Sequence, residues 1–176
     1  MTDGPMSAFT PIQLRITLVD SEPEVWRQVV VPGAVALADL HGIIQDAMGW
    51  ERSHDHSFQA GLGAEKVLLA EEKRLSAVLA DAGDSLIYYN YDFESGWRHR
   101  IVGESLSHSD AGVLPVCTAG GSACPPEGSG GIWGYDQFLA KLEDVEDPDY
   151  VNLLDQYGDF DPGAFDLAAV NARLLG

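Results

Sequence analysis

Residues 11–50 read PIQLRITLVDSEPEVWRQVVVPGAVALADLHGIIQDAMGW, and this stretch carries the clearest signal of the fold class. Apolar and polar residues alternate over 12–18, as is typical of a half-buried strand. A turn at 20–23 separates this strand from a β-branched run over 25–31. Because the connection is so short, the two strands are predicted to form an antiparallel hairpin.

The spacing of apolar residues changes after residue 36. Leu37, Leu40 and Ile44 follow each other at intervals of three and four, which indicates an amphipathic helix. Gly49 suits the end of this helix, because glycine readily takes the left-handed conformation found there. His41 lies on the apolar stripe, and we interpret it as a core residue with one hydrogen-bonded nitrogen rather than a catalytic group.

The chain then returns to strand-like patterns. Residues 53–60, 86–93 and 97–102 are predicted strands, with a short strand at 67–69 and a helical turn at 75–80. The order strand, strand, helix, further strands resembles that of β-grasp folds, in which one helix packs across a mixed sheet. We therefore expect an α+β fold with a β-grasp-like mixed sheet and one packed helix, followed by a Gly/Pro-rich loop and C-terminal helices.

The predicted organisation is a loose leader over 1–11 and a single domain over 12–176. Within this domain, 12–106 form the sheet and helix core, 107–134 form the Gly/Pro-rich loop, and 135–176 form an acidic helical part. Helices in the last part are expected over 135–142, from Pro148 onward, and over 165–175.

Charge restricts the classes of partner. The chain has 28 acidic and 10 basic residues, a formal net charge of −18. Residues 1–100 contribute −7 and residues 101–176 contribute −11. Such a surface repels phosphate backbones, so we do not expect direct nucleic-acid binding. The excess of acid also favours solubility.

The sequence indicates a cytoplasmic protein. It has no basic stretch followed by an apolar run near its start, as a secretory signal would need. No apolar run approaches 18 residues, so no membrane span is expected. Cys117 and Cys124 are therefore expected to be free thiols in a reducing compartment.

His54 and His56 carry the sharpest chemical signal. If 53–60 is one strand, these side chains share a face and both imidazoles are able to meet one metal ion. Cys124 and Glu127 in the Gly/Pro-rich loop would complete a site for a divalent metal such as zinc. The alternative is that both histidines are partly buried sheet residues hydrogen-bonded to their neighbours.

Four further residues are candidates for the lining of a pocket near this site. His99 and Trp97 share one face of a predicted strand, and Cys117 precedes the loop. Asp92 is a candidate acid or base, although a solvated loop carboxylate is the simpler interpretation. No pair of nucleophile and base and no cofactor motif is evident, so the sequence favours a protein without catalytic activity.

Seven blocks of sequence occur together in one order: Val25-Trp26-Arg27; Leu40-His41 with Met48-Gly49-Trp50; His54-Asp55-His56-Ser57-Phe58; Tyr91-Asp92-Phe93 with Trp97 and His99; Pro115-Val116-Cys117; Cys124-Pro125-Pro126-Glu127 with Gly130-Gly131; and Phe160-Asp161-Pro162 with Phe165-Asp166 and Val170-Asn171. Over residues 11–175 they resemble the plasmid pRiA4b ORF-3-like family, which includes proteins labelled as passengers of mobile elements. The resemblance implies an association with mobile genetic elements but no particular chemistry.

The chain departs from the family pattern in three places. Gly128-Ser129 stands where an acidic residue and a cysteine usually follow the Cys-Pro-Pro-Glu block, Asp55 stands where leucine is common, and Glu94 replaces a glycine. The first departure removes a thiol from any cysteine-based metal site that the family shares.

Three functions remain open from the sequence. The first is a non-catalytic accessory protein that binds a protein or a small ligand, with the acidic helical part as its interaction surface. The second is a metal-binding, hydrolytic protein with its site at His54, His56 and the loop. The third is a DNA mimic whose acidic side chains imitate phosphates; its candidate residues are Asp144, Asp147, Asp155 and Asp159.

Overall fold

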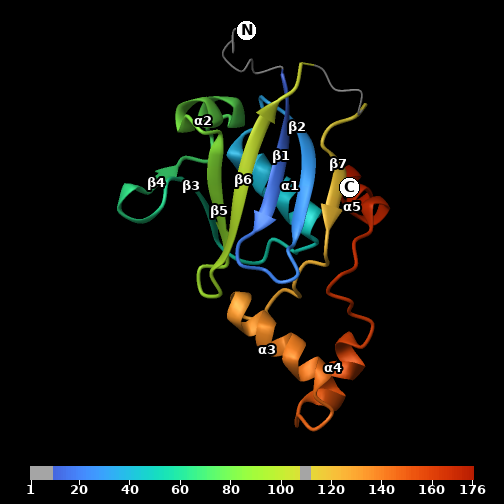
Figure 1. Cartoon of the computed structure of the whole chain (residues 1–176). Helices are drawn as coiled ribbons and strands as arrows, with labels where there is room; N and C mark the ends of the chain where they lie inside the picture. Colours follow the sequence, from blue (N-terminus) through green and yellow to red (C-terminus); the bar gives the residue numbers. More distant parts are fainter. Residues whose placement is uncertain (1–9, 108–111) are drawn as a thin grey trace.

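The computed structural model describes residues 10–107 and 112–176, so most of the predicted leader lies outside the described residues. Seven strands form one sheet in the order β4-β3-β5-β6-β1-β2-β7 (Figure 1). The strands are β1 (Pro11–Leu18), β2 (Trp26–Pro32), β3 (His56–Ala60), β4 (Val67–Leu69), β5 (Leu86–Tyr91), β6 (Trp97–Ser105) and β7 (Val116–Gly121). The helices are α1 (Leu37–Met48), η1 (Gly63–Glu65, a 3-10 turn), α2 (Leu75–Ala82), α3 (Gly131–Glu143), α4 (Tyr150–Tyr157) and α5 (Leu167–Leu175).

The predicted hairpin is confirmed, and it lies inside the sheet between β6 and β7. β1 pairs with β2 on one side and with β6 on the other, in both cases antiparallel. Ile12, Leu14 and Ile16 are fully buried on one face of β1, while Arg15 between them is exposed. The alternation in the sequence is thus the alternation of a strand with one covered face.

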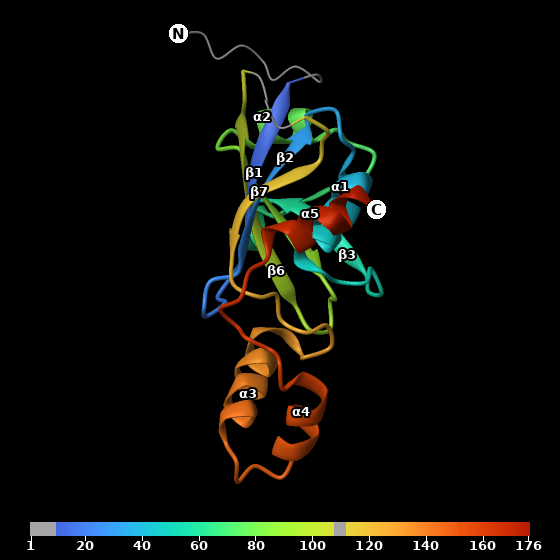
Figure 2. The same ribbon diagram turned by 90° about the vertical axis from the view of Figure 1, so that its right-hand side faces the viewer.

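Helix α1 covers that face, and α5 lies beside it on the same side of the sheet (Figures 1 and 2). α1 ends at Gly49, whose φ of 90° is left-handed and whose N–H donates to the carbonyl oxygen of Gln45 at 2.7 Å. The α+β class is confirmed. All pairings among the described strands are antiparallel, however, whereas a β-grasp-like sheet would be mixed.

β7 lies within the segment predicted to be a loop over 107–134. It adds to the edge of β2, with Cys117 opposite Val29 and a register shift between Gln28 and Val29. The sequence of β7 ends in Thr-Ala-Gly-Gly and does not alternate, so only its pairing with β2 makes it a strand. Residues 108–111 of the predicted loop lie outside the described residues.

Helices α3 and α4 pack against each other beyond one end of the sheet (Figure 1). α3 begins at Gly131, four residues before the predicted start, and α4 begins at Tyr150. Of the three C-terminal helices, α5 packs on the sheet, where it contacts β7. In the described part of the chain, every helix is too short or too polar to cross a membrane.

Candidate functional site

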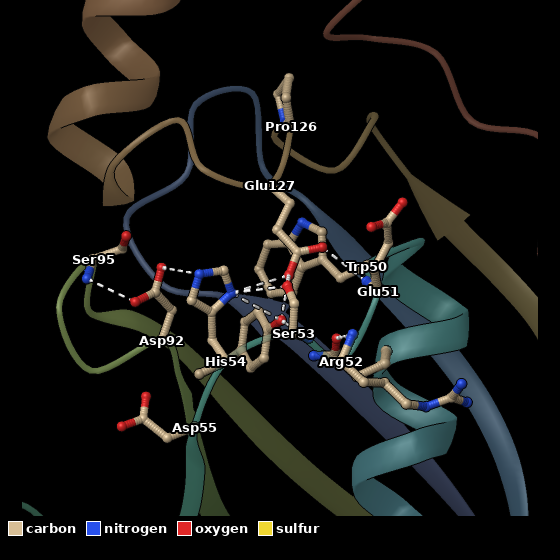
Figure 3. A network of polar contacts seen from close by, with 12 residues as sticks. Trp50, Glu51, Arg52, Ser53, His54, Asp55, Asp92, Ser95, Pro126 and Glu127 are labelled. Carbon is tan, nitrogen blue, oxygen red and sulfur yellow. Dashed lines mark hydrogen bonds and ion pairs between the residues drawn. The ribbon is translucent and has the colours of Figure 1, made fainter.

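A polar network lies where the segment before β3, the β5–β6 turn and the loop over 122–130 meet (Figure 3). His54 is at its centre. Its Nδ1 lies 3.1 Å from Ser53 Oγ, 3.3 Å from Tyr91 Oη and 3.3 Å from Glu127 Oε1. Its Nε2 lies 3.8 Å from Asp92 Oδ2, and the side chain is 39% exposed. This imidazole therefore connects buried groups to solvent.

Glu127 fixes the loop to the segment after α1. Its Oε2 accepts the backbone N–H of Glu51 at 2.8 Å, and its Oε1 accepts the hydroxyl groups of Ser53 and Tyr91. Burial acts to raise the pKa of Glu127, but the hydrogen bonds from Tyr91, Glu51 and Ser53 outweigh it, so the pKa is lowered. Because several donors of the chain already occupy this carboxylate, Glu127 is an anchor and not a free base.

A second bond supports the same loop. The indole N–H of Trp50 donates to the carbonyl oxygen of Pro125 at 2.9 Å, and the Trp50 ring stacks on that of Tyr91. The prolines at 125 and 126 restrict the path of the backbone, so two attachment points suffice to set the position of Glu127.

Asp92 closes the other side of the site. Its φ of 54° is left-handed, a conformation that Asp tolerates better than most residues. Its Oδ1 accepts the backbone N–H of Ser95 at 3.2 Å, which leaves Oδ2 facing His54. Burial acts to raise the pKa of Asp92, but the hydrogen bonds from Ser95 and the nearby His54 outweigh it and lower the pKa.

His56 belongs to a different cluster. Its ring stacks on that of His41, and its Nε2 lies 2.6 Å from Oε1 of Glu71. The expectation that His54 and His56 project from one strand is not met, because β3 begins only at His56 and His54 precedes it. The period of two that aligns side chains in a strand therefore does not apply to this pair.

Cys124 faces away from the network as well. It lines a cavity together with Arg27 and Arg173, and burial raises the pKa of its thiol to about 12. Cys124 and Glu127, the two metal ligands predicted in the loop, therefore lie in different environments.

The four residues predicted to line a pocket also lie in separate places. Trp97 and His99 are fully buried in the core against the ring of Trp50. Cys117 is buried in β7. Only Asp92 lies at the network around His54.

A divalent metal does not fit the predicted set of ligands. Within residues 10–107 and 112–176, no group of three or more His, Cys, Asp or Glu side chains is placed to hold a metal ion. His54 and Glu127 do come together, but His56 is stacked on His41 and Cys124 lines a separate cavity. A tetrahedral zinc site needs its donors around one point, and these residues do not supply it.

Sequence reasoning missed Tyr91 and Ser53, which complete the network. Tyr91 was recognisable only as an inward residue of a strand, since alternation does not tell which ring carries a bonded hydroxyl. Arg27 was also missed. It lies on the same face of β2 as Val29 and Val31, and an arginine on an apolar strand face is a signal that the sequence does offer.

The atoms of the site that remain available to a ligand are Nε2 of His54 and Oδ2 of Asp92. Their separation of 3.8 Å is longer than a hydrogen bond. A proton on Nδ1 fits the neighbouring carboxylate of Glu127 and leaves Nε2 as an acceptor. The pair is therefore suited to a group that carries two or more N–H or O–H donors.

Fold and site together define a class of α+β proteins in which a loop rich in proline and glycine is fixed to the covered face of an antiparallel sheet. The chain belongs to the family of plasmid pRiA4b ORF-3-like proteins, whose model matches residues 10–169. The predicted resemblance is confirmed, and the plasmid in the family's description agrees with the expected link to mobile elements.

Two relatives illustrate the family. An uncharacterized protein, y4hQ, of Sinorhizobium fredii is 34% identical over 173 residues, which cover 93% of this chain and 88% of the relative. The crystal structure of a protein of unknown function, MM3350 from Methanosarcina mazei Go1, is similar with a TM-score of 0.79 and 32% identity. This match covers 91% of the present chain and 97% of that one.

Proposed function

We propose that the protein is a non-catalytic accessory protein that binds a basic side chain of a protein partner between His54 and Asp92. The observation that supports this best is the open pair of Nε2 and Oδ2, 3.8 Å apart, in a network whose other carboxylate is already occupied. A guanidinium group carries donors for both atoms in one plane, and its bonds to a carboxylate are charge-assisted.

The surrounding charge favours a basic partner. Glu51 and Asp55 lie beside the network (Figure 3) and are exposed. Glu94 is exposed in the same turn as Asp92. Residues 131–166, which include α3 and α4, contain ten acidic residues and one basic residue, a net charge of −9. Such a field attracts a basic surface before contact and raises the association rate.

The groups that would act in catalysis are engaged elsewhere. Glu127 accepts hydrogen bonds from the chain itself, and Tyr91 donates its hydroxyl to Glu127. Burial and this bond raise the pKa of Tyr91, so the phenol stays protonated. The thiol of Cys124, with its pKa raised to about 12, is a poor nucleophile. These features support binding rather than turnover.

The experiment is a fluorescence anisotropy titration of the full chain with a labelled hexa-arginine peptide at about 0.15 M salt. Asp92→Asn and His54→Gln are expected to weaken binding at least fivefold. Glu94→Gln is the matched control, because it removes one negative charge from the same turn without touching the pair, and it should change binding less than twofold. If all three variants weaken binding equally, the attraction is general and the proposal is wrong.

A DNA mimic is a special case of a basic partner, and the acidic segment is the reason to test it. Two of its four candidate carboxylates are used inside the chain, since Asp144 accepts the N–H of Glu146 at 3.0 Å and Asp147 accepts that of Asp149 at 2.8 Å. This weakens the case for a surface that imitates phosphates. Competition between this protein and duplex DNA for a DNA-binding protein encoded by a mobile element would reveal mimicry, and its absence would restrict the partner to other basic proteins.

A further inference from the structure

A separate cavity lies between the end of α1, residues 123–124 and α5. Its volume is about 390 Å³, and it shares no lining residue with the network around His54. Apolar side chains form part of its wall, among them Met48, Phe165 and Val170. Its size lies within the range of sites for small molecules.

Arg27 presents a buried positive charge to this cavity. The residue is 3% exposed, and its guanidinium donates to the backbone carbonyl oxygens of Ala47 at 3.0 Å, Trp26 at 2.7 Å and Gly121 at 3.0 Å. The ring of Phe165 lies 4.8 Å from Cζ. Nε and Nη1 make all of these bonds, so the two N–H groups of Nη2 have no bond to another described residue.

Arg173 brings a second positive charge to the same cavity. Its Nε donates to the carbonyl oxygen of Asp46 at 2.7 Å, and its charge contributes to lowering the pKa of Arg27, after burial as the main cause. Neither arginine forms an ion pair with any carboxylate among the described residues. Two adjacent cations without an acidic partner are unexpected in a chain with 28 acidic residues and 10 basic ones.

One acidic side chain lies in the wall of the cavity, but it is used by the chain itself. Asp166 lines the cavity, but its Oδ1 accepts the N–H of Ala169 at 3.0 Å and so caps α5. Cys124 also lines the cavity, and its raised pKa keeps the thiol uncharged. The cavity therefore has two cations, one carboxylate and apolar walls, and the carboxylate of Asp166 forms no ion pair with Arg27 or Arg173.

We propose that this cavity binds a small organic anion, with its carboxylate or phosphate group between Arg27 and Arg173 and its apolar part against Phe165 and Val170. Burying a guanidinium without a counter-charge is costly, and an oxyanion that accepts from Nη2 removes that cost. Arginine is suited to this role because its planar fork matches the oxygens of both anions. The inference rests on residues that the proposed function does not use.

The test is calorimetric titration of the full chain with phenyl phosphate, benzoate and inorganic phosphate, each at an ionic strength matched with sodium chloride. We expect saturable binding of phenyl phosphate or benzoate, and the tighter of the two identifies the natural head group. Inorganic phosphate should bind at least tenfold more weakly, because it lacks the apolar part. Absence of saturable binding of both aromatic anions would overturn the proposal.

Variants locate the site. Arg173→Gln, at an exposed position of α5, is expected to weaken binding at least tenfold. Arg100→Gln is the matched control, because it removes the same charge from an exposed position of β6 that does not line the cavity, and it should change binding less than twofold. Arg27→Lys keeps the positive charge but loses the planar guanidinium group, and it should also weaken binding. Equal affinities in Arg173→Gln, Arg27→Lys and the unaltered chain, all folded by circular dichroism, would show that the anion binds elsewhere.

Discussion

The imidazole rings of His41 and His56 are stacked, with their centroids 3.6 Å apart and their planes inclined by 3°. The pair connects α1 to the start of β3. Nδ1 of His41 lies 2.7 Å from the hydroxyl of Tyr89, and Nε2 of His56 lies 2.6 Å from Oε1 of Glu71. Two stacked imidazolium ions would repel each other, so the stack is stable with at most one charge.

Acidification should therefore destabilise the protein through His41. Its pKa is lowered to about 4 by burial, then by His56 and Arg52. The unfolded chain takes up this proton near pH 6.5, so between pH 6.5 and pH 4 it binds more protons than the folded chain, and stability falls as the pH is lowered. His41→Phe keeps a stacked ring and should reduce the fall between pH 7 and pH 5 by about 1–2 kcal/mol. Urea denaturation at the two pH values measures it, and an unchanged fall would contradict this assignment.

His99 should also lower the stability of the protein as the pH falls, and the main cause is its burial. It is fully buried, and neither ring nitrogen makes a hydrogen bond of good geometry among the described residues. Burial lowers its pKa to about 3 and outweighs a contact with the backbone of Tyr89 that acts to raise it. Stability that depends on neutral His99 is present above pH 6.5 and is lost as the pH falls toward 3. His99→Phe removes unpaired polar atoms, so it should cost little or stabilise at pH 7, and should gain about 2 kcal/mol relative to the unaltered chain at pH 5. A large loss at pH 7 would show that the imidazole makes a bond essential to the core.

Glu127→Gln should loosen the loop from the segment after α1. Glutamine keeps one acceptor oxygen, but it loses the charge that strengthens the bonds from Glu51, Ser53 and Tyr91. We expect a loss of about 1–3 kcal/mol and faster hydrogen exchange at the amide of Glu51. Glu94→Gln removes an exposed carboxylate and should leave both quantities unchanged. Unchanged exchange at Glu51 in Glu127→Gln would mean that the anchor lies elsewhere.

The contact between α3 and the β5–β6 turn depends on a missing side chain. At Gly131, φ is 75° and a Cβ atom would lie 2.2 Å from the carbonyl oxygen of Ser95. At Gly128, φ is 84° but no atom lies within 4 Å of the same position. Gly128→Ala should therefore cost about 1 kcal/mol from backbone conformation alone, and Gly131→Ala about 3 kcal/mol or more because the helix must shift. Similar melting temperatures for the two variants would rule out this close approach.

The sequence predicts the elements whose periodicity reflects burial. Ile12, Leu14 and Ile16 alternate because one face of β1 is covered, and the stripe on α1 is the complementary surface that covers it. β7 escapes prediction because its strand character depends on the edge of β2 and not on its own residues. The same reason explains the error at His54, since the first residue of β3 is set by pairing with β5, in which His56 lies opposite Tyr91.

The candidate site was predictable in part. His54 and Glu127 are chemically conspicuous, and they do meet across 73 positions of the chain. Which other groups join them depends on how the proline-rich loop packs against Trp50 and Tyr91. No local sequence pattern predicts this packing. Spacing alone also could not show that Cys124, three residues from Glu127, faces Arg27 instead.

Asn171 gives the last test, because its side chain completes the open edge of the sheet. Its Oδ1 accepts the N–H of Cys117 at 2.8 Å, and its Nδ2 donates to the carbonyl oxygen of Cys117 at 2.9 Å. α5 thus pairs with β7 much as a further strand would, and an unpaired edge invites association with other chains.

Asn171→Asp keeps the shape but replaces the donor with a charged acceptor that faces the carbonyl oxygen of Cys117. We expect a loss of about 1–3 kcal/mol, faster hydrogen exchange at the Cys117 amide and a greater tendency to aggregate. Asn152→Asp makes the same change at an exposed position of α4 and should have little effect. If both variants unfold at the same urea concentration as the unaltered chain, the packing of α5 alone, through Val170 and its neighbours, holds the edge of β7 closed.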